Sequence, residues 1–386
     1  MSDFVSGNKI VLLRNGTEYF PALQQAIDAA QYEIHLQTYI FEDDAVGRAV
    51  AEALMRAAGR GVSACLLLDG FGCKEIPPAF VIELQTAGVE VLFYRPKISP
   101  WTLRRRRLRR LHRKVAVIDG RIAFVGGINI IDDMNAPDHM PPRVDYAVSV
   151  EGLLLAQIHA STRRLWRRTA WARLLRVDAG RLAGHVRPQA AGPMWAAYVV
   201  RDNIWHRRAI ENVYLEAIDS ARHEIVIANS YFLPGVRFRR ALVGAARRGV
   251  RVVLLLQSRV EYVLLDYASR ALYDQMLDAG VEIHEYQKSL MHSKVAVIDG
   301  HWATVGSSNI DPFSLLLARE ANVVVEDAGF AGELRQDLER SIQNGASRVS
   351  QASWRHDHFG RRLVARLLYG LIRFFMGVVI GYPERR

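Results

Sequence analysis

Two histidines, each followed two residues later by a lysine, are the side chains in this sequence best suited to chemistry. The motif His-x-Lys-x4-Asp occurs twice with the same spacing, as His112, Lys114 and Asp119 and as His292, Lys294 and Asp299. Alternate residues of a β-strand share one face, so the histidine and the lysine of each copy should project from the same side of a sheet. Each copy therefore predicts a nucleophile beside a cation.

A short Gly/Ser/Asn turn follows each motif after six residues. The first reads Gly-Gly-Ile-Asn and ends at Asn129, and the second reads Gly-Ser-Ser-Asn, contains Ser307 and ends at Asn309. Amide side chains, hydroxyls and closely spaced backbone N–H groups suit the binding of phosphate oxygens. Because Gly127 stands where the second copy has Ser307, we expect the two sets of phosphate contacts to differ.

Two such half-sites that face each other would supply the groups needed for two successive displacements at one phosphorus. One histidine attacks the phosphorus and the other protonates the leaving alcohol; we favour His112 as the nucleophile. The lysines and asparagines would neutralise the charge that builds on the phosphoryl oxygens, a task often given to metal ions. No metal and no cofactor is therefore expected, and no metal-ligand spacing stands out elsewhere in the sequence.

A histidine that alternates between base and acid needs a carboxylate on its second ring nitrogen. Asp145 and Glu320 follow the two motifs at comparable distances and are the candidates to orient the histidines. The alternative is that each carboxylate forms a plain salt bridge with a neighbouring arginine.

The chain is internally duplicated. The seven residues Lys114–Gly120 are identical to Lys294–Gly300, 180 positions later. Hydrophobic periodicity in the first half predicts helices near 17–30 and 44–59 and strands near 32–40 and 62–69, and the second half repeats this order. Strands alternating with helices indicate two α/β domains, each a mixed β-sheet flanked by helices.

The length of 386 residues accommodates two domains and a tail. The composition shifts predict a first domain over 1–176 with a basic insertion at 97–111, a linker over 177–193, a second domain over 194–360 and a C-terminal tail over 361–386.

Positive charge points to an anionic partner. The sequence has 51 Lys and Arg against 40 Asp and Glu, a formal net charge of +11. The insertion carries six arginines between residues 104 and 110 and could grip anionic head groups, although a solvated basic loop is the alternative. Residues 361–382 predict a basic amphipathic helix in the membrane interface, with three arginines on one stripe, or else a helix docked on the protein body.

The duplicated motif, with H-x-K-x4-D followed by G-[GS]-x-N, resembles the phospholipase D superfamily and within it the bacterial cardiolipin synthases. The phrases that carry the resemblance include Tyr39-Ile40-Phe41-Glu42-Asp43-Asp44, Phe124-Val125-Gly126-Gly127-Ile128-Asn129 and Ala228-Asn229-Ser230-Tyr231-Phe232. The resemblance implies domains related by a pseudo-two-fold, one active site at their interface and a phosphatidyl-histidine intermediate. It also implies catalytic roles for the six motif residues and phosphate binding by Asn129, Asn309 and Ser307. Asp119 and Asp299 precede a glycine in a strand-ending turn, however, which favours a structural role for them.

The function expected from this resemblance is transfer of a phosphatidyl group from phosphatidylglycerol to make cardiolipin. A short chain of this kind would sit peripherally on the anionic cytoplasmic face of the inner (cell) membrane. Hydrolytic phospholipase D and a nuclease or phosphodiesterase of the same superfamily are the alternatives. The apolar, arginine-bearing tail favours lipid over nucleic acid. The acceptor alcohol stays open among phosphatidylglycerol, phosphatidylethanolamine, glycerol and others, as does the oligomeric state.

Overall fold

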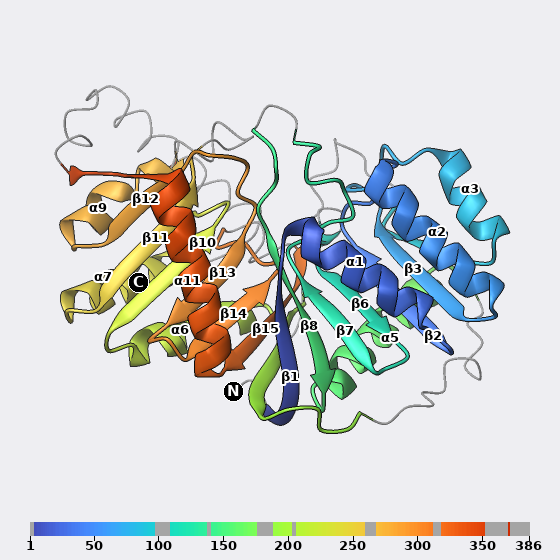
Figure 1. The fold of residues 1–386 in the computed structure, drawn as a ribbon. Helices are drawn as coiled ribbons and strands as arrows, with labels where there is room; N and C mark the ends of the chain where they lie inside the picture. The colour runs from blue at the N-terminus through green and yellow to red at the C-terminus, as the bar shows by residue number, and fades with distance from the viewer. Residues whose placement is uncertain are drawn as a thin grey trace.

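One long mixed β-sheet runs through the whole molecule, with helices on both faces (Figure 1). The structure is a computed structural model that describes residues 4–96, 109–136, 140–175, 188–202, 206–258, 268–311, 318–351 and 370. The predicted insertion is therefore described only from residue 109, the linker only from residue 188 and the tail only at residue 370. Among the described residues, no helix combines the length and apolar character needed to cross a membrane.

The elements of the two halves occur in the same order. The first half contains β1 (Val5–Arg14), α1 (Asn15–Asp28), β2 (Glu33–Thr38), α2 (Ala45–Gly59), β3 (Ser63–Asp69), α3 (Pro78–Thr86), β4 (Glu90–Tyr94), β5 (Arg110–Leu111), β6 (Lys114–Ile118), β7 (Ile122–Gly126), β8 (Tyr146–Gly152) and α5 (Leu155–Trp171). The second half contains β9 (Met194–Arg201), α6 (Ala209–Ser220), β10 (Glu224–Asn229), α7 (Val236–Arg247), β11 (Arg251–Gln257), α9 (Tyr273–Asp278), β12 (Glu282–Tyr286), β13 (Lys294–Ile298), β14 (Trp302–Gly306), β15 (Ala318–Glu326), α11 (Ala328–Gly345) and β16 (Ala346–Arg348).

The strand order reads the same outward from the centre of the sheet. It runs β1-β8-β7-β6-β2-β3-β4 in one direction and β9-β15-β14-β13-β10-β11-β12 in the other. The predicted duplication into two mixed α/β units is confirmed. The two sheets are continuous, however, because β1 pairs antiparallel with β9 through Val5 with Ala196 and Asn8 with Met194. Strand β1 was not predicted, and the predicted boundary at residues 177–193 stays a prediction.

Helices of the two halves cover opposite faces. In the first half α1, α2 and α3 pack on one face and α5 on the other; in the second half α6, α7 and α9 pack on one face and α11 on the other. In Figure 1 α1 and α11 lie in front of the sheet, whereas α5 and α6 lie behind it. The axis of the pseudo-two-fold therefore lies in the plane of the sheet, and rotation about it exchanges the two faces of the sheet.

Local sequence explains where the helices begin and end. Asp44 precedes α2 and its carboxylate accepts the Gly47 N–H at 2.8 Å; Asp327 caps α11 in the same way through Phe330 N–H. Gly61 follows α2 with φ +88°, a conformation that glycine adopts without strain. These signals place the predicted helices near 17–30 and 44–59, and the strands after them, close to where they are observed.

Candidate active site

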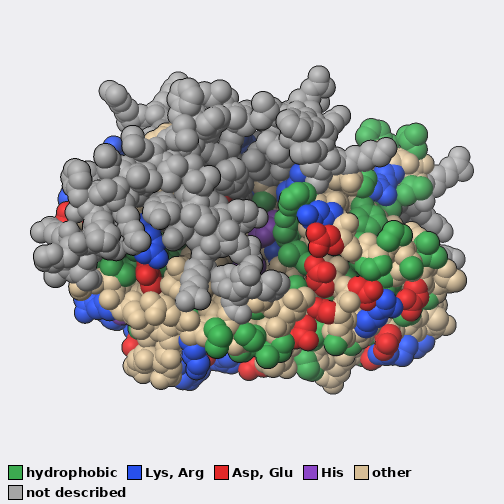
Figure 2. Space-filling view, turned by 90° about the horizontal axis from the view of Figure 1, so that it is seen from above, with side chains coloured by type: hydrophobic (Ala, Val, Ile, Leu, Met, Phe, Trp, Pro, Cys, Tyr) green, Lys and Arg blue, Asp and Glu red, His purple; other side chains and the backbone are tan. Residues whose placement is uncertain are grey.

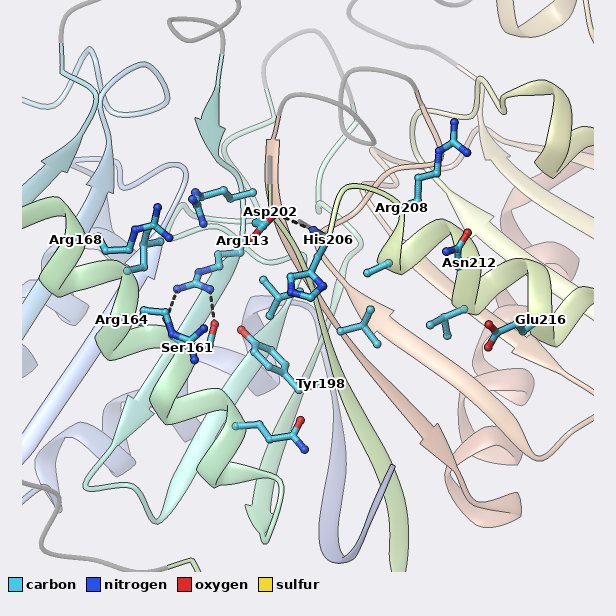
Figure 3. Close-up of a pocket in the computed structure, with 17 residues that line it drawn as sticks. Arg113, Ser161, Arg164, Arg168, Tyr198, Asp202, His206, Arg208, Asn212 and Glu216 are labelled. Carbon is cyan, nitrogen blue, oxygen red and sulfur yellow. Dashed lines mark hydrogen bonds between the residues drawn. The ribbon is translucent and has the colours of Figure 1, made fainter. Parts of the chain in front are cut away.

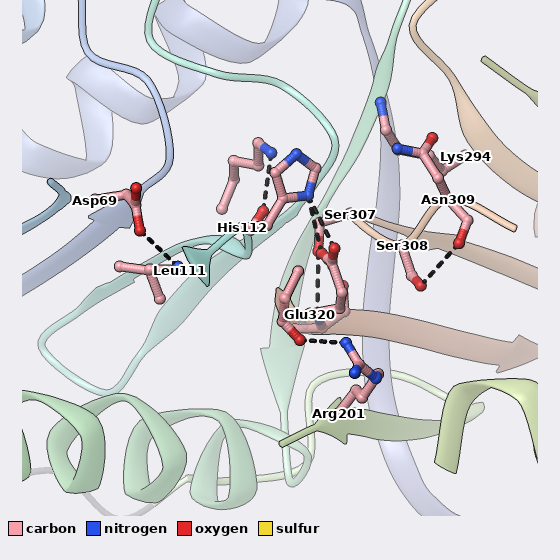
Figure 4. Close-up of polar contacts among 12 residues, drawn as sticks. Asp69, Leu111, His112, Arg201, Lys294, Ser307, Ser308, Asn309 and Glu320 are labelled. Carbon is pink, nitrogen blue, oxygen red and sulfur yellow. Dashed lines mark hydrogen bonds and ion pairs between the residues drawn. The ribbon is translucent and has the colours of Figure 1, made fainter. Parts of the chain in front are cut away.

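His112 lies between β5 and β6. Strand β5 pairs with β15, so this histidine lies where the two halves are in contact. Its Nδ1 is 3.1 Å from Glu320 Oε2 and 3.0 Å from Glu320 Oε1, and its backbone N–H donates to the Arg319 carbonyl at 3.0 Å (Figure 4). The Tyr39 ring lies against the imidazole, with centroids 4.7 Å apart. The carboxylate and the backbone partner of this histidine both come from β15 of the second half.

His292 mirrors this arrangement. Its Nδ1 is 2.8 Å from Asp145 Oδ2, and its backbone N–H donates to the Val144 carbonyl at 2.7 Å. Asp145 precedes β8 in the first half, so each histidine contacts a carboxylate of the opposite half. The sequence predicted both carboxylates as orienting groups without assigning a histidine to each, and the structure places each one at the histidine of the other half. Seen from above, histidine side chains appear in a hollow near the middle of the molecule (Figure 2).

The two lysines are buried beside the histidines. Lys114 Nζ donates to the His112 carbonyl at 2.8 Å, and Lys294 Nζ lies 3.4 Å from Asp145 Oδ2. Burial, together with the charge of Lys294, lowers the pKa of Lys114 to about 7, and burial lowers the pKa of Lys294 to about 8. Both lysines are therefore buried beside the histidines, and the loss of hydration disfavours their charged forms.

The same surroundings act on His292 and Asp145. Burial and then the charge of Lys294 lower the pKa of His292 to about 3, against the opposite influence of Asp145. Burial alone would raise the pKa of Asp145, but Lys294 and His292 hold it below its ordinary value. His292 is thus a neutral imidazole paired with a carboxylate anion at neutral pH.

The two turn asparagines are held by their side-chain oxygens. Asn129 Oδ1 accepts the Ile40 N–H at 3.2 Å, and Asn309 Oδ1 accepts the Ser230 hydroxyl at 3.0 Å. Both side chains are at least nine-tenths buried. Fixing the oxygen in this way leaves the amide N–H groups as donors.

Ser307 and Gly127 serve the two carboxylates differently. The Ser307 hydroxyl donates to Glu320 Oε2 at 2.5 Å and accepts the Ala321 N–H at 3.1 Å. A Cβ at Gly127 would lie 2.3 Å from Asp145 Oδ1. The second half thus uses a serine to hold the longer carboxylate, while the first half needs a glycine to admit the shorter one. Ser307, predicted to bind phosphate, is engaged with Glu320.

Asp119 and Asp299, predicted among the catalytic residues, are placed at the other end of their strands. Each follows a five-residue strand that begins at the motif lysine, about 16 Å of extended chain. The Asp119 carboxylate accepts backbone N–H groups from Gln31, Tyr32 and Glu33 at 2.8–2.9 Å. The Asp299 carboxylate accepts three in the same way, from residues 222–224. These contacts fix a loop to a turn, as the glycine after each aspartate suggested.

One cluster with metal-ligand composition escaped the sequence reasoning. Glu33, His35 and His159 bring ligand atoms within 4.8 Å of one another. His159 comes from α5, far along the chain from β2, so no local spacing reveals it. Glu33 lies 2.7 Å from His159 Nε2 and 3.2 Å from His35 Nε2, which satisfies the carboxylate without an ion. Glu33 lies beside Asp119, at the opposite end of β2 from Tyr39, whose ring contacts His112.

Other residues around the histidines were also missed as individuals. Asp69 is fully buried and accepts the Leu111 N–H at 2.7 Å, which fixes the strand that leads to His112. Ser230 occupies the position that corresponds to Tyr39 in the duplication. In the second half the Ser230 hydroxyl donates to Asn309, whereas in the first half the Tyr39 ring packs against His112. The repeat alignment was the signal that could have found both.

Comparisons with known proteins agree with the duplicated architecture. A family model described as cardiolipin synthase, PLD-like domain, matches residues 23–137 and 214–342. Cardiolipin synthase B of Salmonella typhi is 39% identical over 386 residues, covering 98% of this chain and 91% of that protein. Cardiolipin synthase B of Escherichia coli K12 is 39% identical over 387 residues with the same coverage. Cardiolipin synthase of Geobacillus thermodenitrificans is 32% identical, covering 95% of this chain and 72% of that protein.

Two solved structures share the fold at low sequence identity. Phosphatidylserine synthase of Haemophilus influenzae aligns with a TM-score of 0.66 at 11% identity, covering 98% of this chain and 95% of that one. Polyphosphate kinase of Porphyromonas gingivalis aligns with a TM-score of 0.57 at 15% identity, covering 95% and 53%.

Proposed function

We propose, on the premise that the chain belongs to the cardiolipin synthase family of phospholipase D-like enzymes, that it converts two molecules of phosphatidylglycerol into cardiolipin and glycerol. The chain is a phosphatidyltransferase of the kind that serves phospholipid synthesis. The observation that carries the finer proposal is the crossed pair His112–Glu320 and His292–Asp145, because it makes one site from both halves.

The proposed reaction has two displacements at one phosphorus. In the first, His112 Nε2 attacks the phosphorus of one phosphatidylglycerol, the bond to the headgroup glycerol breaks, and His292 gives its proton to the departing oxygen. In the second, the glycerol hydroxyl of another phosphatidylglycerol attacks the phosphatidyl-histidine. His292 takes that hydroxyl proton, and the phosphorus–nitrogen bond breaks to free His112.

The carboxylates support this exchange by position and charge. With the Nδ1 proton directed at Glu320 or Asp145, each histidine presents its Nε2 to the substrate. A bound phosphodiester brings negative charge to the two lysines, which offsets their lowering of the His292 pKa. Substrate binding would therefore prepare His292 to carry the proton that it gives to the leaving group.

The remaining polar groups divide into two sets. We assign phosphate binding to Lys114, Lys294 and the amide N–H groups of Asn129 and Asn309, which supply fixed positive charge and donors. We assign positioning roles to Ser307, which holds Glu320, and to the aspartates Asp119 and Asp299, which fix their turns. With phosphate binding assigned to these lysines and asparagines, no step of the proposed displacement needs a metal ion.

We also propose peripheral binding to the anionic cytoplasmic face of the inner membrane. A net charge of +11 favours such a surface, and the arginines predicted in the insertion and the tail would approach lipid phosphates. The nuclease alternative would use the same charge, but the apolar residues of the tail have no role in it.

The deciding experiment incubates purified protein with phosphatidylglycerol vesicles and separates the lipids. Cardiolipin with equimolar glycerol is the expected result. Phosphatidic acid would instead indicate hydrolysis, and unchanged lipid with cleaved single-stranded DNA would indicate a nuclease. Adding phosphatidylethanolamine or free glycerol as competing acceptors identifies the alcohol that enters second.

A further inference from the structure

A basic groove lies between α5 and α6 (Figure 3). Its cavity measures about 670 Å³. Its floor includes Arg113 and Arg319, the neighbours of His112 and Glu320, whose side chains point away from the catalytic centre as alternation along an extended chain requires. The charged side chains that line the groove are Arg113, Arg164, Arg168, Arg208 and Arg319 against Asp202 and Glu216. The balance of charge in the groove is strongly positive.

Arg113 is the most unusual member of this set. It is 1% exposed, and its guanidinium donates to Gln37 Oε1 at 2.6 and 2.9 Å and to Ser161 Oγ at 3.0 Å. Among the described residues no carboxylate forms an ion pair with it. Burial lowers the pKa of Arg113, and the charge of Arg319 adds to this. A buried cation without a counter-ion is costly for folding, so its presence points to a ligand that supplies the negative charge.

Arg164 and Arg168 form the outer wall. They are one helical turn apart on α5, both are exposed, and within the described part of the chain neither forms an ion pair. Figure 3 shows them on the same side of the cavity as Arg113, with Asn212 of α6 and Arg208, the residue before α6, across it. The groove is thus lined from both halves of the molecule.

The pseudo-symmetry supplies an internal comparison. The counterpart of this region on the front face lies between the end of β1 and α11, where Arg14 pairs with Glu333 at 2.7 Å and with Asp337 at 3.4 Å. The Tyr146 hydroxyl donates to Asp337 at 2.6 Å. Carboxylates of the protein neutralise the arginine there, whereas Arg113 contacts a serine of α5. Arg14 is thus paired with carboxylates of the protein, whereas Arg113 has no such partner among the described residues, and the second motif has Ser293 in the place of Arg113.

We propose that the basic groove binds the phosphodiester headgroup of a second anionic phospholipid, distinct from the lipids that react at the histidines. The inference rests on the proposed function for the choice of a lipid as ligand. A phosphodiester monoanion presents two non-bridging oxygens, which match the fork of a guanidinium. Arg113 lies in the backbone between His112 and Lys114, so a bound headgroup would also steady the segment that carries them.

The test compares two full-length variants that lose the same charge. R164Q/R168Q removes the outer wall of the groove, and R237Q/R240Q removes two exposed arginines of α7 outside it. Glutamine preserves helix propensity, and Arg113 stays in place because it is buried. Each protein is titrated calorimetrically with glycerophosphoglycerol, with inorganic phosphate and with phosphatidylglycerol vesicles.

We expect two glycerophosphoglycerol sites in the wild type and in R237Q/R240Q. In R164Q/R168Q one of them should weaken at least roughly tenfold, since two charge-assisted contacts are lost. The same stoichiometry and affinity in both variants would overturn the groove as a site. Inorganic phosphate that binds the groove as tightly as glycerophosphoglycerol would overturn the lipid as its ligand. Absence of cardiolipin synthesis with an intact groove site would count against the proposed function alone.

Discussion

His112 and His292 each contact a carboxylate of the opposite half, so we expect the two halves to depend on each other for catalysis. Glu320 and Asp145 each act on a histidine of the other half, so the loss of either carboxylate should disable the whole site. We expect Asp145→Asn and Glu320→Gln to lower kcat by about 10²–10⁴, because the imidazole loses the anion that sets its tautomer and its charge. Initial rates of cardiolipin formation measure this. Glu333→Gln, a surface change on α11, is the matched control, and near-normal kcat in either test variant would contradict the roles.

The two histidines should be essential but not equivalent. Replacing His112 or His292 by alanine should reduce turnover by at least 10²–10⁴, the usual contribution of an acid–base group. A phospho-enzyme trapped by rapid quenching should map to one histidine, and we expect His112. Label on His292 alone would reverse the two roles, and label on neither would exclude the covalent intermediate.

The buried lysines give the reaction an alkaline limit. Lys114, with a pKa of about 7, and Lys294, with a pKa of about 8, are charged below those values and neutral above them. Phosphate binding should therefore weaken as pH rises, and kcat/KM, which reports the free enzyme, should fall above about pH 7 to 8. Lys114→Arg should move this fall to higher pH because a guanidinium stays charged. The surface change Lys288→Arg should leave the profile unaltered, and a kcat/KM that is flat to pH 9 would refute the argument.

At the scale of elements, the sequence predicted what depends on local patterns. The duplicated motif, the helices near 17–30 and 44–59 and the glycine that ends α2 all follow from residue spacing and backbone preference. Strand β1 was missed because its pairing with β8 and β9 joins distant segments. The sequence also left open which histidine each carboxylate contacts, because this depends on how the two-fold brings the halves together. The Glu33–His159 contact depends on the packing of α5 and leaves no mark in local sequence.

The turn aspartates should matter for folding more than for chemistry. Asp119→Ala and Asp299→Ala each remove a carboxylate that accepts three backbone N–H groups, and unsatisfied donors cost about 1–3 kcal/mol. We expect lower urea midpoints with kcat within a few-fold of wild type at temperatures where the variants are folded. A hundredfold loss of kcat at unchanged stability would restore the catalytic role first expected for them.

At the scale of the whole molecule, activity should not require a metal ion. The fixed lysines and asparagines supply the positive charge and donors at phosphorus, and the Glu33, His35 and His159 cluster lies at the other end of β2. Cardiolipin synthesis should survive dialysis against excess chelator. Loss of activity in chelator that one divalent ion restores would contradict this prediction. As a control, the same ion should leave the kcat of a sample that never met chelator unchanged.

Membrane attachment should depend on the C-terminal tail. Residues 361–382 carry Arg362, Arg366 and Arg373 within about 40° of one another on a helical projection, with leucines, phenylalanines and a valine over the remaining arc. Apolar side chains would enter the acyl region while each arginine adds on the order of 1 kcal/mol at an anionic surface.

Deleting 361–386 should therefore reduce co-sedimentation with phosphatidylglycerol vesicles, and neutralising the three arginines to glutamine should reduce it less. Phosphatidylcholine vesicles separate the two contributions, because they retain the apolar one alone. A folded, soluble truncation that binds phosphatidylglycerol vesicles as well as the full chain would rule out the membrane helix, whereas a truncation that unfolds would show that the tail docks on the protein body.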